Sequence, residues 1–188
     1  MKETSIIKAL IENKGDMNIS RVAKIAGKDY KTAHTIVKRI EKAGILKIRN
    51  FGKSAKIELI NSPNPLIFQA EYERREELLK NKNIRVMLES FLSGLKTRLF
   101  ILLLFGSHAK KTAKKDSDID LLFIVPGDTE DKKINSIADT IPLDLHINVF
   151  SESEFIEMKN SKKITVGSEA IEKNIILHGI ETYYELIK

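Results

Sequence analysis

The amino-acid sequence predicts two domains, a small α+β domain at residues 1–62 and a larger α/β domain at residues 66–188. A cluster of turn-forming residues, Asn61-Ser62-Pro63-Asn64-Pro65, separates them, because each proline disfavours helix at the preceding residue. Helical patterns followed by two strand patterns precede this cluster, whereas helices and strands alternate after it. Charge divides at the same place: residues 1–66 hold 14 Lys and Arg against 6 Asp and Glu, a net charge of +8, and the remainder has a net charge of −2.

The composition of the 188 residues, with 42% hydrophobic and 31% charged, is that of a globular protein. The absence of Cys excludes disulfide frameworks, thiolate zinc sites and catalytic thiols. The amino-terminal segment lacks the apolar core and cleavage site of a signal peptide, and the longest apolar run, residues 99–105, is too short to span a bilayer. We therefore expect a cytoplasmic protein without a membrane partner. The basic first third favours a nucleic-acid-binding module, although a solvated lysine surface explains the charge equally well.

The first domain is predicted to contain three helices and a two-stranded hairpin. Apolar residues recur at helical spacing over residues 6–11 and again over residues 22–25, after the turn at Asn18. A third helix begins after the capping residue Asp29 and ends at Gly44. Strand patterns at residues 45–49 and 55–60 flank a polar turn.

The third helix and its following turn, DYKTAHTIVKRIEKAGIL at residues 29–46, resemble the recognition helix of bacterial and archaeal winged helix-turn-helix regulators. A recognition helix needs an apolar face toward its partner helices and a polar outer face toward the major groove of DNA. The residues expected to contact double-stranded DNA are Tyr30, Lys31, Thr32, His34, Thr35 and Lys38 on the helix, and Lys53 and Lys56 on or near the wing. The alternative is a winged-helix fold that contacts another protein.

The second domain is predicted to begin with a mostly helical segment at residues 66–98. A buried strand at residues 99–105, a second strand at 118–125 and a third at 143–150 follow, with a helix at 131–139 between the last two. Shorter helices are expected near residues 153–158 and 168–173, and a final helix at 180–187. This alternation is typical of an α/β or α+β core.

Chemistry-bearing residues lie at the ends of two of these strands. Gly106 and Ser107 follow the first strand, and Asp118 and Asp120 open the second. Residues two apart in a strand point to the same face, so the two carboxylates project together and repel each other unless a cation lies between them. Mg²⁺ is usually held by one or two carboxylates plus substrate phosphates. Gly106 lets the backbone approach a phosphate, and Ser107 can donate its hydroxyl and N–H, so the pattern indicates phosphoryl or nucleotidyl transfer.

The pattern G-S-x10-D-x-D between apolar strands resembles the DNA polymerase β-like nucleotidyltransferase superfamily, and especially its minimal nucleotidyltransferase group. The resemblance implies a short mixed sheet with flanking helices, a nucleoside triphosphate such as ATP, and two Mg²⁺ ions. It assigns Gly106 and Ser107 to the phosphates and Asp118 and Asp120 to the metal ions and catalysis.

The family also has a third carboxylate on a later strand. In the predicted strand 143–150, alternation places Asp144, His146 and Asn148 on one face, and Asp144 is the only carboxylate. We therefore predict Asp144 as the third catalytic and metal-binding residue. The alternative is that Asn148 occupies the third position, in which case catalysis is weak or lost.

Three functions are consistent with this sequence. The first is a Mg²⁺-dependent nucleotidyltransferase that moves AMP, or another nucleotide, to a hydroxyl of a protein or small molecule and carries a DNA-binding domain. The second is a transcription regulator whose nucleotidyltransferase domain only senses a nucleotide. The third is an autoregulating antitoxin, because members of the minimal group are often partners of small helical toxin-like proteins. A homodimer is a further assembly to be tested.

Overall fold

The computed structural model describes residues 2–188 except residues 16, 52–53, 115, 127–129 and 162. Contacts group the chain into two compact units that meet in the sequence between Glu73 and Arg74, with Lys188 belonging to the first unit. Helix α4 (Pro65–Leu78) runs through this position. The domain limits expected from the turn cluster, residues 1–62 and 66–188, stay a prediction.

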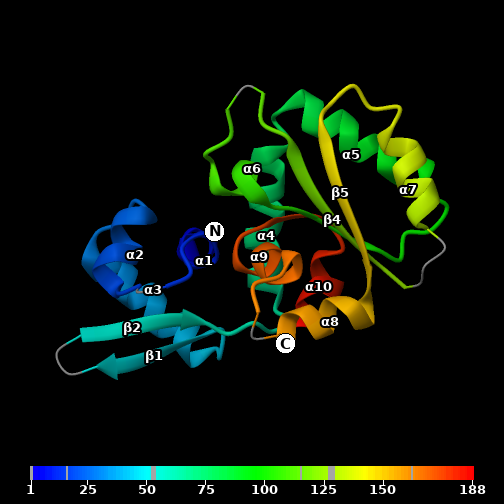
Figure 1. Ribbon diagram of the computed structural model, residues 1–188. Coiled ribbons are helices and arrows are strands. Elements are labelled where there is room, and N and C mark those ends of the chain that lie inside the picture. The colour runs from blue at the N-terminus through cyan, green and yellow to red at the C-terminus, as the bar shows by residue number, and fades with distance from the viewer. Residues whose placement is uncertain (1, 16, 52–53, 115, 127–129, 162) are drawn as a thin grey trace. The chain divides into compact units, whose positions relative to one another are not determined.

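The first unit contains the three helices and the hairpin that the sequence predicts (Figure 1). Helices α1 (Lys2–Glu12), α2 (Ile19–Ile25) and α3 (Tyr30–Lys42) precede strands β1 (Leu46–Phe51) and β2 (Ser54–Leu59), which pair antiparallel. Side chains cap two of the helices: Asn18 accepts the N–H of Arg21 and Asp29 accepts the N–H of Thr32, each at 2.9 Å. These bonds satisfy amide groups that lack partners at a helix start, and they fix where α2 and α3 begin.

The core of the first unit forms where the apolar stripes of its elements meet. Ile7 of α1, Val37 of α3 and Ile57 of β2 are at most 1% exposed. Helix α1 contacts both α3 and β2, so the hairpin packs against the helices. Because these apolar residues all point inward, the polar residues of α3 are left on its outer face.

The second unit is built on a four-stranded mixed sheet with the strand order β5–β4–β3–β6. The strands are β3 (Ile101–Leu104), β4 (Ile119–Val125), β5 (Leu145–Ser151) and β6 (Ile175–His178). Strands β4 and β5 run parallel, whereas β3 is antiparallel to both β4 and β6. The short mixed sheet expected from the sequence is confirmed.

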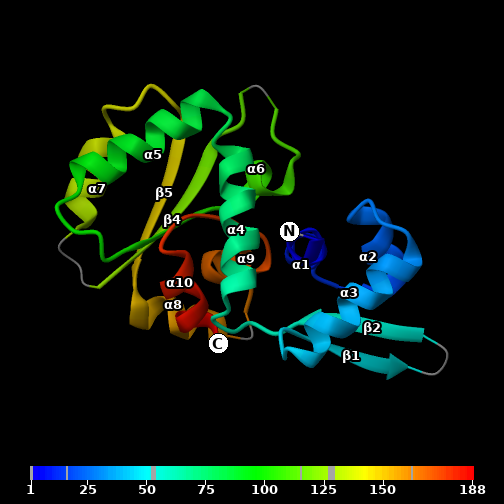
Figure 2. The same ribbon diagram turned by 180° about the vertical axis from the view of Figure 1, so that it is seen from behind.

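Two helices cover one face of this sheet, α5 (Lys82–Gly94) and α7 (Asp131–Ala138). The strands β4 and β5 lie in front of α5 in Figure 1, and α5 lies in front of them in the opposite view of Figure 2. Phe91 of α5 and Ile134 of α7 are fully buried in one cluster with Leu121 and Phe123 of β4, and the rings of Phe91 and Phe123 meet edge to face with their centroids 5.0 Å apart. Because β4 residues alternate between faces, Asp120 points away from this cluster.

The remaining helices are α6 (Gly106–Lys110), α8 (Glu152–Asn160), α9 (Val166–Glu172) and α10 (Ile180–Ile187). Helix α8 contacts β4 and β5, and α10 contacts β3 and α8. They contribute apolar residues such as Phe155 and Tyr184, which are at most 3% exposed. Asp120 therefore belongs to the same sheet face as α8 and α10, at the end of the sheet where β4 begins.

The structure differs from the predicted elements in several places. The strand predicted at residues 143–150 is Leu145–Ser151, so Asp144 directly precedes it. The helical segment at residues 66–98 is two helices, because the chain turns at residues 79–81 and Asn81 caps α5 by accepting the N–H of Asn83 at 3.0 Å. The strand predicted at residues 99–105 is limited to Ile101–Leu104. Strand β6 was not predicted from the sequence: its four residues match the length of a helical turn as well as a strand, and only pairing with β3 decides between them.

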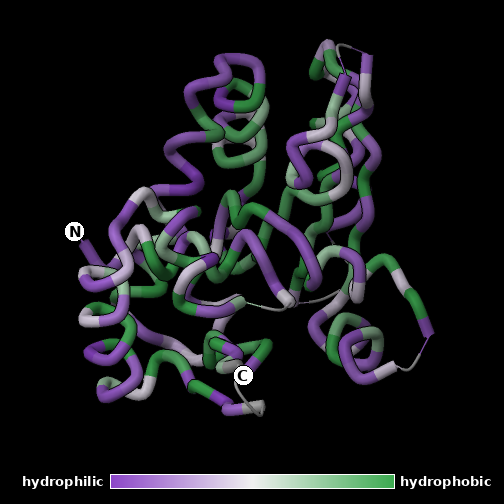
Figure 3. Tube along the Cα trace, turned by 90° about the vertical axis from the view of Figure 1, so that its left-hand side faces the viewer, coloured by the Kyte–Doolittle hydropathy of each residue, from purple (hydrophilic) through white to green (hydrophobic). Residues whose placement is uncertain are grey.

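No helix among the described residues is long and apolar enough to cross a membrane. Figure 3 shows the same feature along the trace, where hydrophobic and hydrophilic stretches alternate within the helices. This alternation reflects one buried and one solvent-facing side for each helix.

Candidate active site

The junction between β3 and α6 is shaped by Gly106. Its φ angle is +62°, a left-handed conformation that residues with a Cβ rarely adopt. A Cβ added at this position would overlap Oδ2 of Asp120, so the backbone of Gly106 lies directly against that carboxylate. The N–H of Phe105 donates to the carbonyl of Asp120 at 3.0 Å, which fixes the junction to the start of β4. Gly106 is thus required both by the backbone turn and by the position of Asp120.

Ser107 follows in the first turn of α6 and carries a buried hydroxyl. Among the described residues its Oγ has no hydrogen-bond partner. The carbonyl of Ser107 accepts the N–H of Thr112 at 3.0 Å, so the backbone here is held while the side-chain hydroxyl stays available. A buried hydroxyl without a partner is energetically unfavourable unless a ligand supplies one, and a phosphate oxygen is a suitable acceptor.

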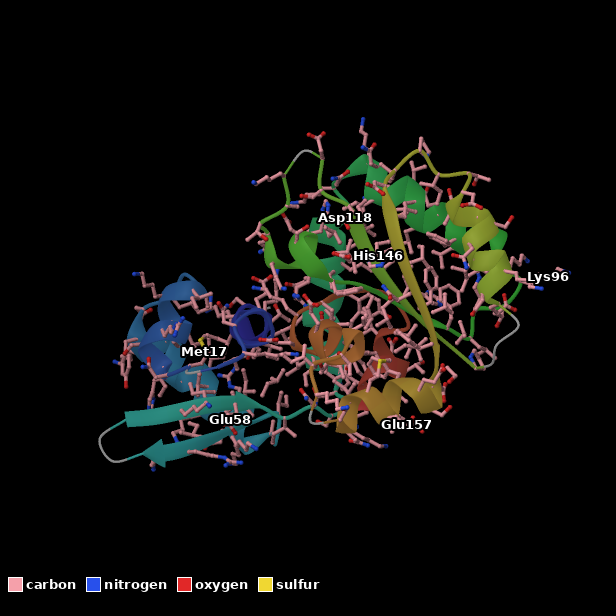
Figure 4. The ribbon with its side chains drawn as sticks, viewed as in Figure 1. Met17, Glu58, Lys96, Asp118, His146 and Glu157 are labelled. Atoms are coloured by element: carbon pink, nitrogen blue, oxygen red, sulfur yellow. The ribbon has the colours of Figure 1, made fainter. Side chains whose placement is uncertain are left out.

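Three side chains form a group that could hold a metal ion: Asp118, Asp120 and His146. Asp118 precedes β4, Asp120 is the second residue of β4, and His146 is the residue opposite Asp120 on the parallel strand β5. The ligand atoms of the three lie within 4.8 Å of one another, and Nδ1 of His146 is 3.2 Å from Oδ1 of Asp120. Figure 4 labels Asp118 and His146 at the same end of these strands. The structure therefore brings the two predicted aspartates together.

Asp144 is not part of that group of three. Its carbonyl accepts the N–H of Ile119 at 2.9 Å, so its backbone lies beside the start of β4, but its side chain is exposed. Asn148 lies opposite Leu122, further along β5, and its Nδ2 is buried without a hydrogen-bond partner among the described residues. The assignment of Asp144 as the third catalytic residue stays a prediction.

His146 is the residue of this group that sequence reasoning did not select. The alternation over the predicted strand 143–150 placed it on the same face as Asp144 and Asn148, and this was the available signal. The register between β4 and β5 decides which residue of β5 lies opposite Asp120. Asp120 and His146 are 26 residues apart in the sequence, and no local pattern fixes the register of two parallel strands so far apart.

Lysines and a histidine lie in the segment between Ser107 and Asp118. Lys110 contacts Glu169 of α9, with Nζ 2.8 Å from Oε1, and this hydrogen bond together with the charge of Glu169 raises the pKa of Lys110. His108 lies with Nε2 3.3 Å from the carbonyl of Ser117 and helps hold the loop that leads to Asp118. Lys110 is thus partly neutralised, and Lys114 is exposed in the same loop.

The residues predicted to contact DNA lie on one helix of the first unit and its hairpin. On α3, Tyr30, Lys31, Thr35 and Lys38 are exposed, and Thr32 and His34 are partly buried. The rings of Tyr30 and His34 stack with their centroids 6.1 Å apart, and Nζ of Lys38 is 2.8 Å from Oε2 of Glu41. The predicted polar outer face is present on α3.

The hairpin carries less free positive charge than its sequence suggests. Glu58 of β2 forms ion pairs with Lys47, Arg49 and Lys56, at 3.2 to 3.5 Å. A hydrogen bond from Lys47 and the nearby positive charges hold the pKa of Glu58 below its usual range. Lys56 is therefore partly neutralised, and Lys53 lies outside the described residues.

A mixed sheet with paired carboxylates beside a Gly-Ser turn is the arrangement expected of a nucleotidyltransferase domain. The family model described as polymerase beta, nucleotidyltransferase matches residues 88–182, half of the chain, and the chain belongs to this family. Nucleotidyl transfer is the general function that this membership supports. The comparisons with curated proteins and with solved structures found no match.

Proposed function

We propose that this protein is a divalent-metal-dependent nucleotidyltransferase that transfers AMP from ATP, or another nucleotide from its triphosphate, to a hydroxyl of a protein or small molecule. The observation that carries the proposal is the convergence of Asp118 and Asp120 with the turn at Gly106 and Ser107. Carboxylates for metal ions and donors for phosphates then lie side by side, as nucleotidyl transfer requires.

The donor set fits a divalent metal ion, because Asp118 and Asp120 offer two neighbouring carboxylates whose like charges repel each other unless a cation lies between them. Divalent ions bound there supply positive charge for the attacking and leaving oxygens. The chain itself holds the triphosphate: Gly106 lets the backbone approach, and the Ser107 hydroxyl donates to a phosphate oxygen. Asp144 remains the proposed acceptor of the proton from the attacking hydroxyl.

The test is transfer of label from α-labelled ATP in the presence of Mg²⁺, with candidate protein and small-molecule acceptors. The variants Asp118→Asn and Asp120→Asn should lose transfer and metal-dependent nucleotide binding together while remaining folded, because each removes a charge and little volume. Asp139→Asn, an exposed carboxylate at the end of α7, is the matched control and should behave as the wild type. Unchanged nucleotide binding in both site variants would refute the proposal.

Asp144→Asn separates the role of this residue from that of the pair. If Asp144 accepts the proton, nucleotide binding survives and transfer falls by orders of magnitude. Unchanged transfer would remove Asp144 from the mechanism.

We propose further that the first unit binds double-stranded DNA in the manner of a winged helix. Three helices followed by an antiparallel hairpin, the exposed polar residues of α3 and the net charge of +8 over residues 1–66 support this proposal. The transferase would then act on, or be controlled from, a site on DNA.

A second candidate function is a nucleotide-sensing regulator or an autoregulating antitoxin with a weak or inactive transferase. The observation that favours it is the composition of the candidate metal site: among the described residues, the third side chain beside Asp118 and Asp120 is His146 and not a carboxylate. Binding of Mg-ATP through Asp118 and Asp120 without any transfer would select the sensor. A small helical protein that co-purifies with the chain would point to the antitoxin.

A further inference from the structure

His146 is held beside the metal-binding aspartates by the pairing of two strands. It lies opposite Asp120 in the β4–β5 register, and its Nδ1 is 3.2 Å from Oδ1 of Asp120. The side chain of His146 is 63% exposed and that of Asp120 is 19% exposed, so the imidazole can adjust without disturbing buried packing. This inference rests on the proposed metal-dependent function and asks which ion the site prefers.

The distance between these atoms suits two ligands of one ion. Metal–ligand bonds of about 2.0–2.2 Å place neighbouring ligands of an octahedral ion about 3 Å apart. The separation of 3.2 Å between Nδ1 and Oδ1 is close to that value, and all three candidate ligand atoms lie within 4.8 Å of one another. Because the side chains of Asp118 and His146 are exposed, rotation of these side chains can bring the three ligand atoms onto one ion.

The type of donor then decides the preference. Mg²⁺ takes oxygen ligands almost exclusively, whereas imidazole nitrogen suits first-row transition-metal ions, whose affinities rise from Mn²⁺ through Co²⁺. A set of two carboxylates and one imidazole is therefore less selective for Mg²⁺ than three carboxylates would be. We propose that His146 is the third ligand of the metal site and that it shifts the preference of the site from Mg²⁺ toward transition-metal ions such as Co²⁺.

The competing third ligand is Asp144, which directly precedes β5. Its backbone is hydrogen bonded to the start of β4, but its carboxyl is outside the group that holds Asp118, Asp120 and His146. Variants of the two residues therefore give different expectations: a variant of His146 changes the metal preference, and a variant of Asp144 does not.

The experiment measures dissociation constants of Co²⁺ and Mg²⁺ alone by calorimetry on the full chain, with the visible spectrum of bound Co²⁺ as a second readout. His146→Ala should weaken Co²⁺ binding at least about tenfold and change the Co²⁺ spectrum, while Mg²⁺ binding changes less than about threefold. His146→Asp should strengthen Mg²⁺ binding relative to Co²⁺, because it restores a third carboxylate. Asp144→Asn should leave the ratio of the two affinities as in the wild type.

His178→Gln, on β6 and outside the group of three, controls for adventitious binding of Co²⁺ by surface imidazoles and should have no effect. If His146→Ala weakens the binding of both metals equally, the imidazole only orients Asp120 and the proposal is overturned. The proposal is also overturned if the metal preference changes in Asp144→Asn alone. If Asp118→Asn leaves the binding of both metals unchanged, the metal site itself fails and the proposed function fails with it. Loss of binding in Asp118→Asn with no effect of His146→Ala refutes only the role of His146.

Discussion

Replacing Gly106 by Ala tests whether the turn after β3 exists to bring a backbone against Asp120. The added Cβ meets two separate obstacles. The backbone must keep a φ of +62°, and the Cβ must occupy space that Oδ2 of Asp120 fills. The first obstacle affects stability, and the second affects the site.

Each obstacle has an expected size. A residue with a Cβ in the left-handed region costs about 1–2 kcal/mol, which lowers the melting temperature of a domain of this size by several degrees. Displacing Asp120 removes a charged ligand, and an interaction of that kind is worth about 1.5–3 kcal/mol, or roughly 10–150-fold in affinity. We therefore expect metal-dependent nucleotide binding to fall by at least tenfold at temperatures where the variant is folded.

Gly44→Ala is the matched control. Gly44 has a φ of +70°, but nothing lies within 4 Å of the Cβ that would be added. It should lose a similar amount of stability and keep wild-type nucleotide affinity. Thermal unfolding by circular dichroism and nucleotide binding by calorimetry measure the two effects separately. If Gly106→Ala binds metal and nucleotide as Gly44→Ala does, the close approach of Gly106 to Asp120 has no functional role.

Three further predictions follow from individual contacts. Ser107→Ala should keep or raise the free energy of unfolding, because it removes a buried hydroxyl without a partner among the described residues. The same variant should weaken triphosphate binding by about 1.5–3 kcal/mol. Urea unfolding and calorimetry on the same samples measure the two effects, and a loss of stability without a loss of binding would contradict the prediction. Binding of duplex DNA should weaken with salt, with a slope near −0.9 per phosphate contact when the logarithm of the binding constant is plotted against the logarithm of the salt concentration. In retardation assays, Lys31→Ala and Thr35→Ala should alter the sequence preference. Lys96→Ala, which changes an exposed lysine of the second unit, should not. Hydrogen bonds from Thr32, mainly from its side chain and also from its backbone N–H, hold the pKa of Asp29 below its usual value. The carboxylate of Asp29 therefore stabilises the fold at pH values above the unfolded pKa of about 3.9. This stabilisation is lost as the pH falls through the lower pKa of the folded state. Unfolding monitored below pH 4 should therefore show a steeper loss of stability in the wild type than in Asp29→Asn, which keeps a good N-cap, and equal acid dependence would exclude this role.

Features that depend on neighbouring residues alone, such as helix starts and the alternation within a strand, could be predicted from the sequence. The helices of the first unit begin where Asn18 and Asp29 cap them, and their apolar stripes mark the buried faces. In the second unit the alternation along β4 showed that Asp118 and Asp120 project together, because a strand repeats every two residues whatever it packs against. The Gly-Ser pair could be recognised from its position after an apolar strand and its spacing to the two aspartates, whereas the left-handed backbone of Gly106 is a finding of the structure.

Only the tertiary structure decided the features that depend on pairing between distant segments. Strand β6 is a strand because its residues complete the edge of the sheet beside β3, and three apolar residues followed by a histidine do not by themselves distinguish a strand from a helical turn. The register of β4 against β5 places His146 opposite Asp120, with Nδ1 3.2 Å from Oδ1, whereas the role predicted for Asp144 stays a prediction. The alternation within either strand is compatible with other registers, so the packing of the whole sheet, and not the pattern of either strand, determines which side chain lies opposite Asp120.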